Sequence, residues 1–153
     1  MATRRRCTGC ESQTVLMAKH VVAAVAEIPP GKKKLVDVSG RKIVVYNLGG
    51  EFFALSDRCP HRGGSLYCGI QTGLVESPEP GDYRYSRLGE MVKCPWHGWE
   101  FDIRSGKSWC DPARLRLRQY EVAVKSGTEL VEGPYRAESF PVRVEDDYVV
   151  VEA

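Results

Sequence analysis

The amino-acid sequence predicts an all-β protein, built from short antiparallel strands in one domain. Short apolar runs rich in β-branched residues recur along the 153 residues, and pairs of turn residues such as Gly49–Gly50 separate them. No segment keeps a helical spacing of apolar residues over several turns. A chain of this length is long enough to bury one hydrophobic core.

The first half of the chain supplies four of the predicted strands. Each is a short apolar or alternating run, and the dipeptides Ser39–Gly40 and Gly49–Gly50 are typical of the tight turns that join neighbouring antiparallel strands. The predicted strands are residues 20–25, 34–38, 41–48 and 51–56.

The second half supplies the remaining predicted strands. Residues 114–124 alternate in two phases, and a slip in register near Arg118–Gln119 would place both apolar sets on one core face. Residues 141–152 are predicted to form two strands joined across Asp146–Asp147. The two apolar sets are Leu115 and Leu117, and Tyr120, Val122 and Val124.

The bulk composition excludes several classes of function. The formal net charge of +2 is too small to indicate nucleic-acid binding, and the basic runs at residues 4–6 and 32–34 are interpreted as solvated surface. The apolar run at residues 21–28 contains Glu27 and is too short to span a membrane. The N-terminal arginines lack the apolar stretch of a secretory signal, so we expect a cytoplasmic protein with reduced thiols.

Two regions differ from the strand pattern. Residues 1–16 are polar and unpatterned, and are expected to form a disordered N-terminal extension that ends just before Met17, which is a possible alternative start. Residues 71–90 are rich in glycine, proline and charge, and are expected to be a surface insertion with a hairpin around Glu79–Asp82.

Two short segments, DRCPHRGGSL (residues 57–66) and KCPWHGWEF (residues 93–101), each hold one cysteine and one histidine. These are Cys59-x-His61 and Cys94-x-x-His97, in a chain with only six cysteines and three histidines. A structural zinc ion can take two cysteines and two histidines, but zinc fingers place like ligands together. One mixed pair in each segment favours a binuclear iron–sulfur cluster over zinc, and a domain that binds no metal is the third alternative.

The motifs CPHRGG and CPWHGWEFD resemble the paired signature of Rieske [2Fe–2S] proteins. The resemblance implies the Rieske fold over residues 17–153, with an antiparallel β-sandwich base and a small cluster-binding subdomain at about 57–112. It implies one [2Fe–2S] cluster, with Cys59 and Cys94 on one iron and His61 and His97 on the other. The 32 residues between His61 and Cys94 (94 − 61 − 1) exceed the usual number, and the excess falls on residues 71–90.

Residues beside the ligands indicate which type of Rieske protein the chain resembles. Rieske proteins of cytochrome bc complexes carry an extra cysteine in each loop, whereas this chain has Gly64 and Trp96 at those positions. They also carry a serine and a tyrosine whose hydroxyls raise the potential, whereas this chain has Trp99 and Phe101. The resemblance therefore implies a potential at the low end of the Rieske range, about −150 mV. The residues expected to surround the cluster are Gly63, Gly64, Trp96, Gly98, Trp99 and Phe101, the aromatic ones either shielding it or packing in the core.

The second motif also resembles the Rieske domain of aromatic-ring oxygenases, which need a separate mononuclear iron held by two histidines and a carboxylate. After His61 and His97 only His20 remains, and its strand context favours a structural role. The chain has no GxGxxG motif after a strand, and no catalytic residue is predicted. The sequence thus favours a Rieske-type ferredoxin that carries electrons from a reductase to a terminal oxygenase. The alternatives are a small electron-transfer subunit of a larger oxidoreductase and, less favoured, an iron–sulfur sensor.

Four cysteines remain outside the predicted ligand set. Cys7 and Cys10 form a CxxC motif in the arginine-rich N-terminal extension, with no second pair, and are interpreted as a tail without function. Cys68 and Cys110 follow the two cluster motifs and are expected to be free thiols in a reducing cytosol.

Overall fold

The computed structural model describes residues 18–132, 136–137 and 146–153. The larger of its two sheets has seven strands in the order β2-β3-β4-β8-β10-β1-β9, so the predicted all-β class is confirmed. The predicted N-terminal extension (1–16) and the first of the two strands predicted in 141–152 lie outside the described residues. The strands are β1 (Lys19–Ala24), β2 (Lys33–Val38), β3 (Arg41–Leu48), β4 (Glu51–Ser56), β8 (Gln119–Ser126), β9 (Arg136–Ala137) and β10 (Asp147–Glu152).

Tight turns set the register of β2, β3 and β4. Val38 pairs with Arg41 across Ser39 and Gly40, and Leu48 pairs with Glu51 across Gly49 and Gly50. All four turn residues have positive φ, the conformation of two-residue turns that match the twist of the strands. Ser39, at φ 52°, is the one turn residue with a side chain, and the Asp37 carboxylate braces its turn by accepting a hydrogen bond from the Gly40 N–H at 2.8 Å.

The seven strands form two halves that pack face to face. One half is β2-β3-β4 and the other contains β8, β10 and β1, and they join where Ala54 and Leu55 of β4 pair with Tyr120 and Gln119 of β8. The core between the halves is aliphatic, and its burial is the main favourable term for the fold. It includes Val22, Ala23, Ile28, Val36, Val38, Ile43, Val45, Ala54, Val149 and Val151.

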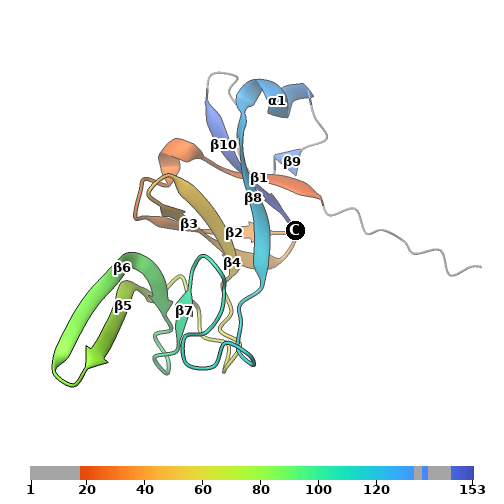
Figure 1. The fold of residues 1–153 in the computed structure, drawn as a ribbon. Coiled ribbons are helices and arrows are strands. Elements are labelled where there is room, and N and C mark those ends of the chain that lie inside the picture. The colour runs from red at the N-terminus through yellow and green to blue at the C-terminus, as the bar shows by residue number, and fades with distance from the viewer. Residues whose placement is uncertain (1–17, 133–135, 138–145) are drawn as a thin grey trace, which may run out of the picture.

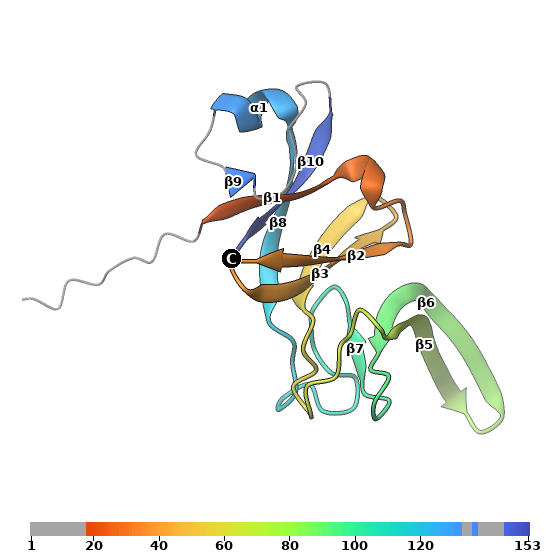
Figure 2. The same ribbon diagram turned by 180° about the vertical axis from the view of Figure 1, so that it is seen from behind.

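A smaller sheet lies below the larger one in Figures 1 and 2, in the order β5-β6-β7. Its strands are β5 (Ile70–Glu79), β6 (Asp82–Lys93) and β7 (Glu100–Asp102). The β5–β6 hairpin extends away from the rest of the molecule in both views and turns between Glu79 and Asp82, where the sequence predicted it. In the described sheets β5 pairs with β6 alone, so its other edge is open.

A second hydrophobic cluster joins the two sheets. Successive residues of β3 alternate between the two cores, since Ile43 and Val45 face the first core whereas Val44 and Tyr46 face the second. The second core also contains both predicted cysteine ligands, so the base of the fold packs directly beneath the candidate metal centre. Its buried members are Val44, Tyr46, Leu55, Cys59, Leu66, Val92, Cys94, Phe101, Ile103 and Leu117.

The prediction for residues 114–124 was wrong in two respects. Strand β8 begins only at Gln119, and residues 114–118 are not part of a strand. Leu117 is buried in the second core, whereas Tyr120 and Val122 pack against the first core on the opposite face of the sheet. The change of parity therefore marks the passage from loop to strand, and the third member of the second apolar set, Val124, is exposed.

Two short helices were not predicted. The 3-10 helix η1 (Val25–Glu27) follows β1, and α1 (Gly127–Glu132) follows β8 at the end of the molecule opposite the smaller sheet. Leu130 of α1 packs with Val21, Tyr148 and Val150. In the described part of the chain, no helix has the length and apolar character that crossing a membrane requires.

Candidate metal centre

Loop 1, residues 57–66, follows β4 and carries Cys59 and His61. The Cys59 N–H donates to the Gly64 carbonyl at 2.8 Å, and the Gly63 N–H donates to the Cys59 carbonyl at 2.8 Å. Gly63 has a φ of +89°, which side chains disfavour, so glycine lets the loop close on itself here.

Loop 2, residues 93–101, leads from the end of β6 into β7 and repeats this backbone frame. The Cys94 N–H donates to the Trp99 carbonyl at 2.8 Å, and the Gly98 N–H donates to the Cys94 carbonyl at 3.0 Å. Gly98 has a φ of +74°. In both loops the cysteine opens the frame and a glycine with positive φ closes it.

The two cysteine side chains lie together in the interior. Cys59 and Cys94 are each only 2% exposed, among the apolar residues of the second core. Burial raises the pKa of the Cys59 thiol, and the neighbouring Cys94 thiol raises it further. Hydrogen bonds from the backbone N–H groups of His61 and Arg62 to the sulfur act in the opposite direction and lower this pKa. The two thiols are therefore neighbours in the interior, and each lies among the apolar side chains of the second core.

The two imidazoles lie outside the sulfur pair. His61 and His97 are exposed, and their ring centroids are 4.9 Å apart at an interplanar angle of 87°. The indole of Trp99 lies 5.6 Å from the ring of His61. The loops thus present two buried sulfur atoms and two exposed imidazole rings as candidate metal ligands.

This donor arrangement fits a binuclear cluster. In a Rieske centre each iron takes two protein ligands, one iron from cysteines and the other from histidines. The space around the sulfurs is tight, because a Cβ at Gly64 would lie 3.0 Å from the Cys94 Sγ and 3.0 Å from the Trp96 ring. No group of three or more histidine, cysteine or acidic side chains among the described residues is arranged to hold a single metal ion.

The aromatic residues of loop 2 occupy three different environments. Phe101 is fully buried in the second core, and Trp99 is partly buried and packs against it. Trp96 is 61% exposed and lies edge-on to His97 at 6.5 Å. Phe101 and Trp99 can exclude water from the sulfur side, whereas Trp96 lies on the outer surface beside the imidazoles.

Two polar residues hold loop 1 and the segment after it in place. The carboxylate of Asp57, 6% exposed, accepts hydrogen bonds from the Ser65 hydroxyl at 2.9 Å and the Tyr67 N–H at 2.7 Å. The Lys33 ammonium donates to the Gly69 carbonyl at 2.6 Å, and burial lowers its pKa. Lys33 was predicted to be solvated surface, which is wrong because its side chain spans from β2 to the segment after loop 1.

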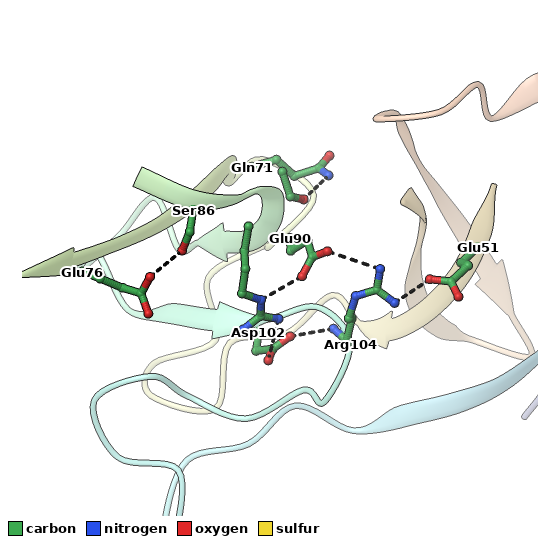
Figure 3. A network of polar contacts seen from close by, with 9 residues as sticks. Glu51, Gln71, Glu76, Ser86, Glu90, Asp102 and Arg104 are labelled. Carbon is green, nitrogen blue, oxygen red and sulfur yellow. Dashed lines mark hydrogen bonds and ion pairs between the residues drawn. The ribbon is translucent and has the colours of Figure 1, made fainter. Parts of the chain in front are cut away.

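An ion network connects the strands around loop 2 to the base (Figure 3). Arg104 pairs with Glu51 of β4 at 2.5 Å and with Glu90 of β6 at 3.2 Å. Arg87 pairs with the same Glu90 at 2.8 Å and with Asp102 of β7 at 3.0 Å. The hydrogen bonds and charges of Arg87 and Arg104 hold the pKa of Glu90 below its ordinary value.

Comparison with known proteins identifies the family. Residues 18–121, most of the chain and including both loops, match the model of the Rieske [2Fe-2S] domain. The chain belongs to the Rieske family. Its cofactor is one [2Fe–2S] cluster, and its role is one-electron transfer. The predicted Rieske fold is confirmed.

The curated relatives of this Rieske protein match it almost along their whole length. It is 33% identical over 118 residues to the 3-phenylpropionate/cinnamic acid dioxygenase ferredoxin subunit of Escherichia coli (strain K12), covering 77% of this chain and 96% of the relative. It is 34% identical over 111 residues to the protein of the same name from Photorhabdus laumondii, covering 72% and 90%.

Solved structures share the fold of this Rieske protein. One is the complex of reduced oxygenase and oxidized ferredoxin in carbazole 1,9a-dioxygenase, with a TM-score of 0.57 at 23% identity, over 89% of this chain and 94% of the matched chain. Another is the ferredoxin of carbazole 1,9a-dioxygenase from Nocardioides aromaticivorans IC177, with a TM-score of 0.52 at 22% identity, over 86% and 96%.

The remaining candidate residues of this Rieske protein lie apart from the two loops. His20 is buried in β1, which pairs with β9 and β10. Cys68 and Cys110 are exposed and form no disulfide. The CxxC motif of Cys7 and Cys10 lies outside the described residues. Sequence reasoning missed Asp57, whose carboxylate bonds to Ser65 and Tyr67 nearby in the sequence. It also missed Lys33 and Arg104, whose partners are 36 and 53 residues away.

Proposed function

We propose that this Rieske protein is a ferredoxin that takes single electrons from a reductase and passes them to a terminal oxygenase. The observation that carries this proposal is the pair of buried sulfurs beneath a pair of exposed imidazoles, the one such site among the described residues. The full sequence has only one further histidine, His20, so it lacks the two histidines of a mononuclear oxygenase iron. Relatives named as dioxygenase ferredoxin subunits support the same role.

For the ligands, we propose Cys59 and Cys94 on one iron and His61 and His97 on the other. The residues proposed to surround the cluster are Gly63, Gly64, Trp96, Gly98, Trp99 and Phe101. We further propose that residues 57–112 form the cluster-binding subdomain, with residues 71–90 as an inserted hairpin. Support comes from the matching backbone frames of the two loops and from the second core that they share with the base.

The mechanism follows from where the loops place their side chains. When bound, the cluster supplies a couple that accepts and returns one electron. Main-chain N–H groups of His61 and Arg62 donate to the Cys59 sulfur, and the second core excludes water from the sulfur side. The exposed imidazoles give a partner its nearest contact with the centre.

The potential is set in part by what loop 2 lacks. Trp99 and Phe101 have no hydroxyl to donate to the sulfur atoms, so the reduced state loses that stabilisation. We therefore propose a midpoint potential of about −150 mV, at the low end of the Rieske range.

We also propose a cytoplasmic location. The exposed thiols of Cys68 and Cys110 are not paired with each other, as expected in a reducing compartment.

The test is electron paramagnetic resonance of the dithionite-reduced protein, with a potential titration on the same sample. We expect a rhombic signal with an average g below that of four-cysteine clusters and a midpoint of about −150 mV. An average g typical of four-cysteine clusters would exclude the histidines as ligands. A colourless protein with bound zinc would overturn the electron-carrier function.

A further inference from the structure

A groove of about 700 Å³ lies beside loop 1, at its junction with the larger sheet. Its walls come from the β2–β3 turn, the end of β4, loop 1 and the start of β8. Four exposed cationic side chains line it, against a single carboxylate. The four cations are Arg41, Lys42, Arg58 and Arg118, and we call this surface the basic groove.

The fold brings these cations together from three distant segments. The Ser56 N–H donates to the Arg118 carbonyl at 2.9 Å, and the Asp57 N–H donates to the Lys42 carbonyl at 3.0 Å. These main-chain bonds tie β8 and β3 to the end of β4, where loop 1 begins. The cations are therefore held side by side on a rigid frame, although nothing in the local sequence groups them.

The positive charge of the basic groove is not neutralised internally. Its one carboxylate, Asp57, is 6% exposed and already accepts hydrogen bonds from Ser65 and Tyr67. None of the four cations forms an ion pair with a carboxylate among the described residues. The Arg118 guanidinium instead lies over the ring of Tyr120, 5.1 Å from its centroid. Several like charges on one concave surface create a potential that attracts anions.

Arg58 connects the basic groove to the metal centre. It directly precedes Cys59, and its side chain lies against loop 1, since a Cβ at Gly63 would be 3.3 Å from the Arg58 Nε. Gly63 is two residues after His61, whose imidazole is exposed. The charged surface thus begins where the electron enters or leaves the protein.

We propose, building on the proposed function, that the basic groove docks a carboxylate-rich surface segment of the redox partner protein. The exposed imidazoles and the 61% exposed Trp96 supply the less polar centre of the contact, and the basic groove supplies its charged rim. Charges beside an electron-transfer site steer the partner and fix its orientation. A partner that exchanges electrons through the exposed imidazoles must contact the surface beside them, which includes the basic groove. This position favours a protein partner over a small anion as the occupant of the groove.

The first test uses ferricyanide as a small anionic oxidant of the reduced holoprotein. Each ferricyanide takes one electron from the protein and becomes ferrocyanide, and stopped-flow absorbance gives the second-order rate constant. The variant Arg41→Gln/Lys42→Gln/Arg118→Gln removes three groove charges and leaves Arg58, next to a proposed ligand, untouched. The control Lys19→Gln/Lys32→Gln/Lys125→Gln removes three charges from the base, none of which lines the groove.

At low ionic strength we expect the groove variant to react roughly tenfold more slowly and the control at most about twofold more slowly, because local charge governs the encounter. With tris(phenanthroline)cobalt(III), a cationic oxidant, the groove variant should react faster than the wild type. Equal rate constants for the groove and control variants would overturn the proposal. If the triple variant fails to fold, the single variants Arg41→Gln and Arg118→Gln replace it, each expected to give part of the effect.

The second test does not depend on electron transfer. A fluorescein-labelled peptide of alternating Asp and Gly is titrated with the protein and followed by fluorescence anisotropy. We expect binding to wild type and control, little binding to the groove variant, and no displacement by inorganic phosphate at matched ionic strength. Displacement by phosphate would instead indicate a small-anion site and overturn protein docking. A wild type without the Rieske resonance signal would refute the proposed function, while peptide binding would still report on the basic groove.

Discussion

Loop 1 and loop 2 share one backbone frame but differ in the side chain five residues after the cysteine. That residue is Gly64 in loop 1 and Trp99 in loop 2, and its carbonyl accepts the cysteine N–H at 2.8 Å in both. A Cβ at Gly64 would come within 3.0 Å of the Cys94 sulfur, whereas the Trp99 indole extends to within 5.6 Å of the His61 ring. Loop 1 leaves space beside the sulfur of loop 2, and loop 2 places an indole beside the imidazole of loop 1.

This difference shows that the main chain and the side chains have separate roles in the site. The main chain positions the sulfurs, and it does so in the same way in both loops because the hydrogen bonds and the positive-φ glycines are the same. The side chains at the fifth position differ, because Gly64 leaves space beside the Cys94 sulfur and the Trp99 indole lies beside the His61 ring. Substitutions can therefore be chosen that change only a proposed ligand atom, only the space beside it, or only the backbone conformation of a loop.

Loss of a sulfur donor should have the largest effect. We expect Cys94→Ser to abolish the cluster, because the buried hydroxyl is a poor replacement for a thiolate ligand. Visible absorbance and iron content of the purified protein measure this. Cys68→Ser is the matched control, since Cys68 is exposed, and it should retain full iron content. An iron-loaded Cys94→Ser protein with a wild-type spectrum would contradict the ligand assignment.

The second prediction separates space from backbone conformation. Gly64→Ala adds a Cβ that collides with Cys94 and Trp96, and we expect a severalfold lower cluster content. Gly98→Ala meets only the end of the Lys93 side chain, at 3.4 Å, and should cost about 1–2 kcal/mol of stability through its positive φ while retaining the cluster. Measurements of iron content and thermal unfolding for both variants distinguish loss of space from backbone strain. A higher iron content in Gly64→Ala than in Gly98→Ala would show that space is not the limiting factor.

The third prediction concerns how each loop is anchored. Loop 1 continues directly from β4, whereas the strands around loop 2 are tied to the base by the Glu90 network. Because Arg87 and Arg104 lower the pKa of Glu90, its contribution is present above the ordinary value of 4.5 and is lost as the pH falls through the folded value. Glu90→Gln should thus be less stable than wild type by up to about 1 kcal/mol at pH 7.

Denaturant unfolding between pH 7 and pH 3 measures this prediction. The difference between wild type and Glu90→Gln should shrink below pH 4.5, the ordinary value for glutamate. Glu79→Gln, at the exposed tip of the hairpin, is the control and should change stability little at any pH. A constant difference at all pH values would exclude ionisation of Glu90 as the cause.

The smallest effect is expected beneath both loops, at Tyr46. Its hydroxyl is buried in the second core without a hydrogen-bond partner among the described residues, and burial raises its pKa. Tyr46→Phe should therefore be as stable as wild type or slightly more stable. Tyr85→Phe is the comparison, because the Tyr85 hydroxyl accepts the Gly73 N–H at 2.6 Å and its loss should cost about 0.5–1.5 kcal/mol. Thermal unfolding ranks the two, and a clear loss for Tyr46→Phe would contradict the prediction.

The sequence was most informative where function depends on local spacing. Cys-x-His and Cys-x-x-His each lie within a few residues, so the four proposed ligands could be selected from the sequence alone. The hairpin turn between Glu79 and Asp82 was equally local. Residues 114–118 misled the prediction because their alternation persists outside any strand, with Leu117 filling the second core from a loop.

Contacts across long sequence separations could not be predicted. Lys33 bonds to a carbonyl 36 residues away, and Arg104 pairs with Glu51 across 53 residues. The basic groove likewise depends on main-chain bonds that join β3, β4 and β8. Charged residues, alone or in short runs, resemble solvated surface in a sequence, and only the folded topology shows which of them meet. Helix α1, with six residues, is too short for a periodic pattern to emerge.

The open edge of β5 bears on whether copies of this protein stay separate at high concentration. An unpaired strand edge can add a strand from a neighbouring molecule and so begin aggregation. The outer part of β5 carries Pro78, which has no N–H to donate, and the charged residues Glu76 and Glu79. Proline and charge along a strand edge disfavour the addition of another strand. We therefore expect the hairpin to extend from the body of the molecule, with Val75 exposed, while its open edge resists pairing with another copy.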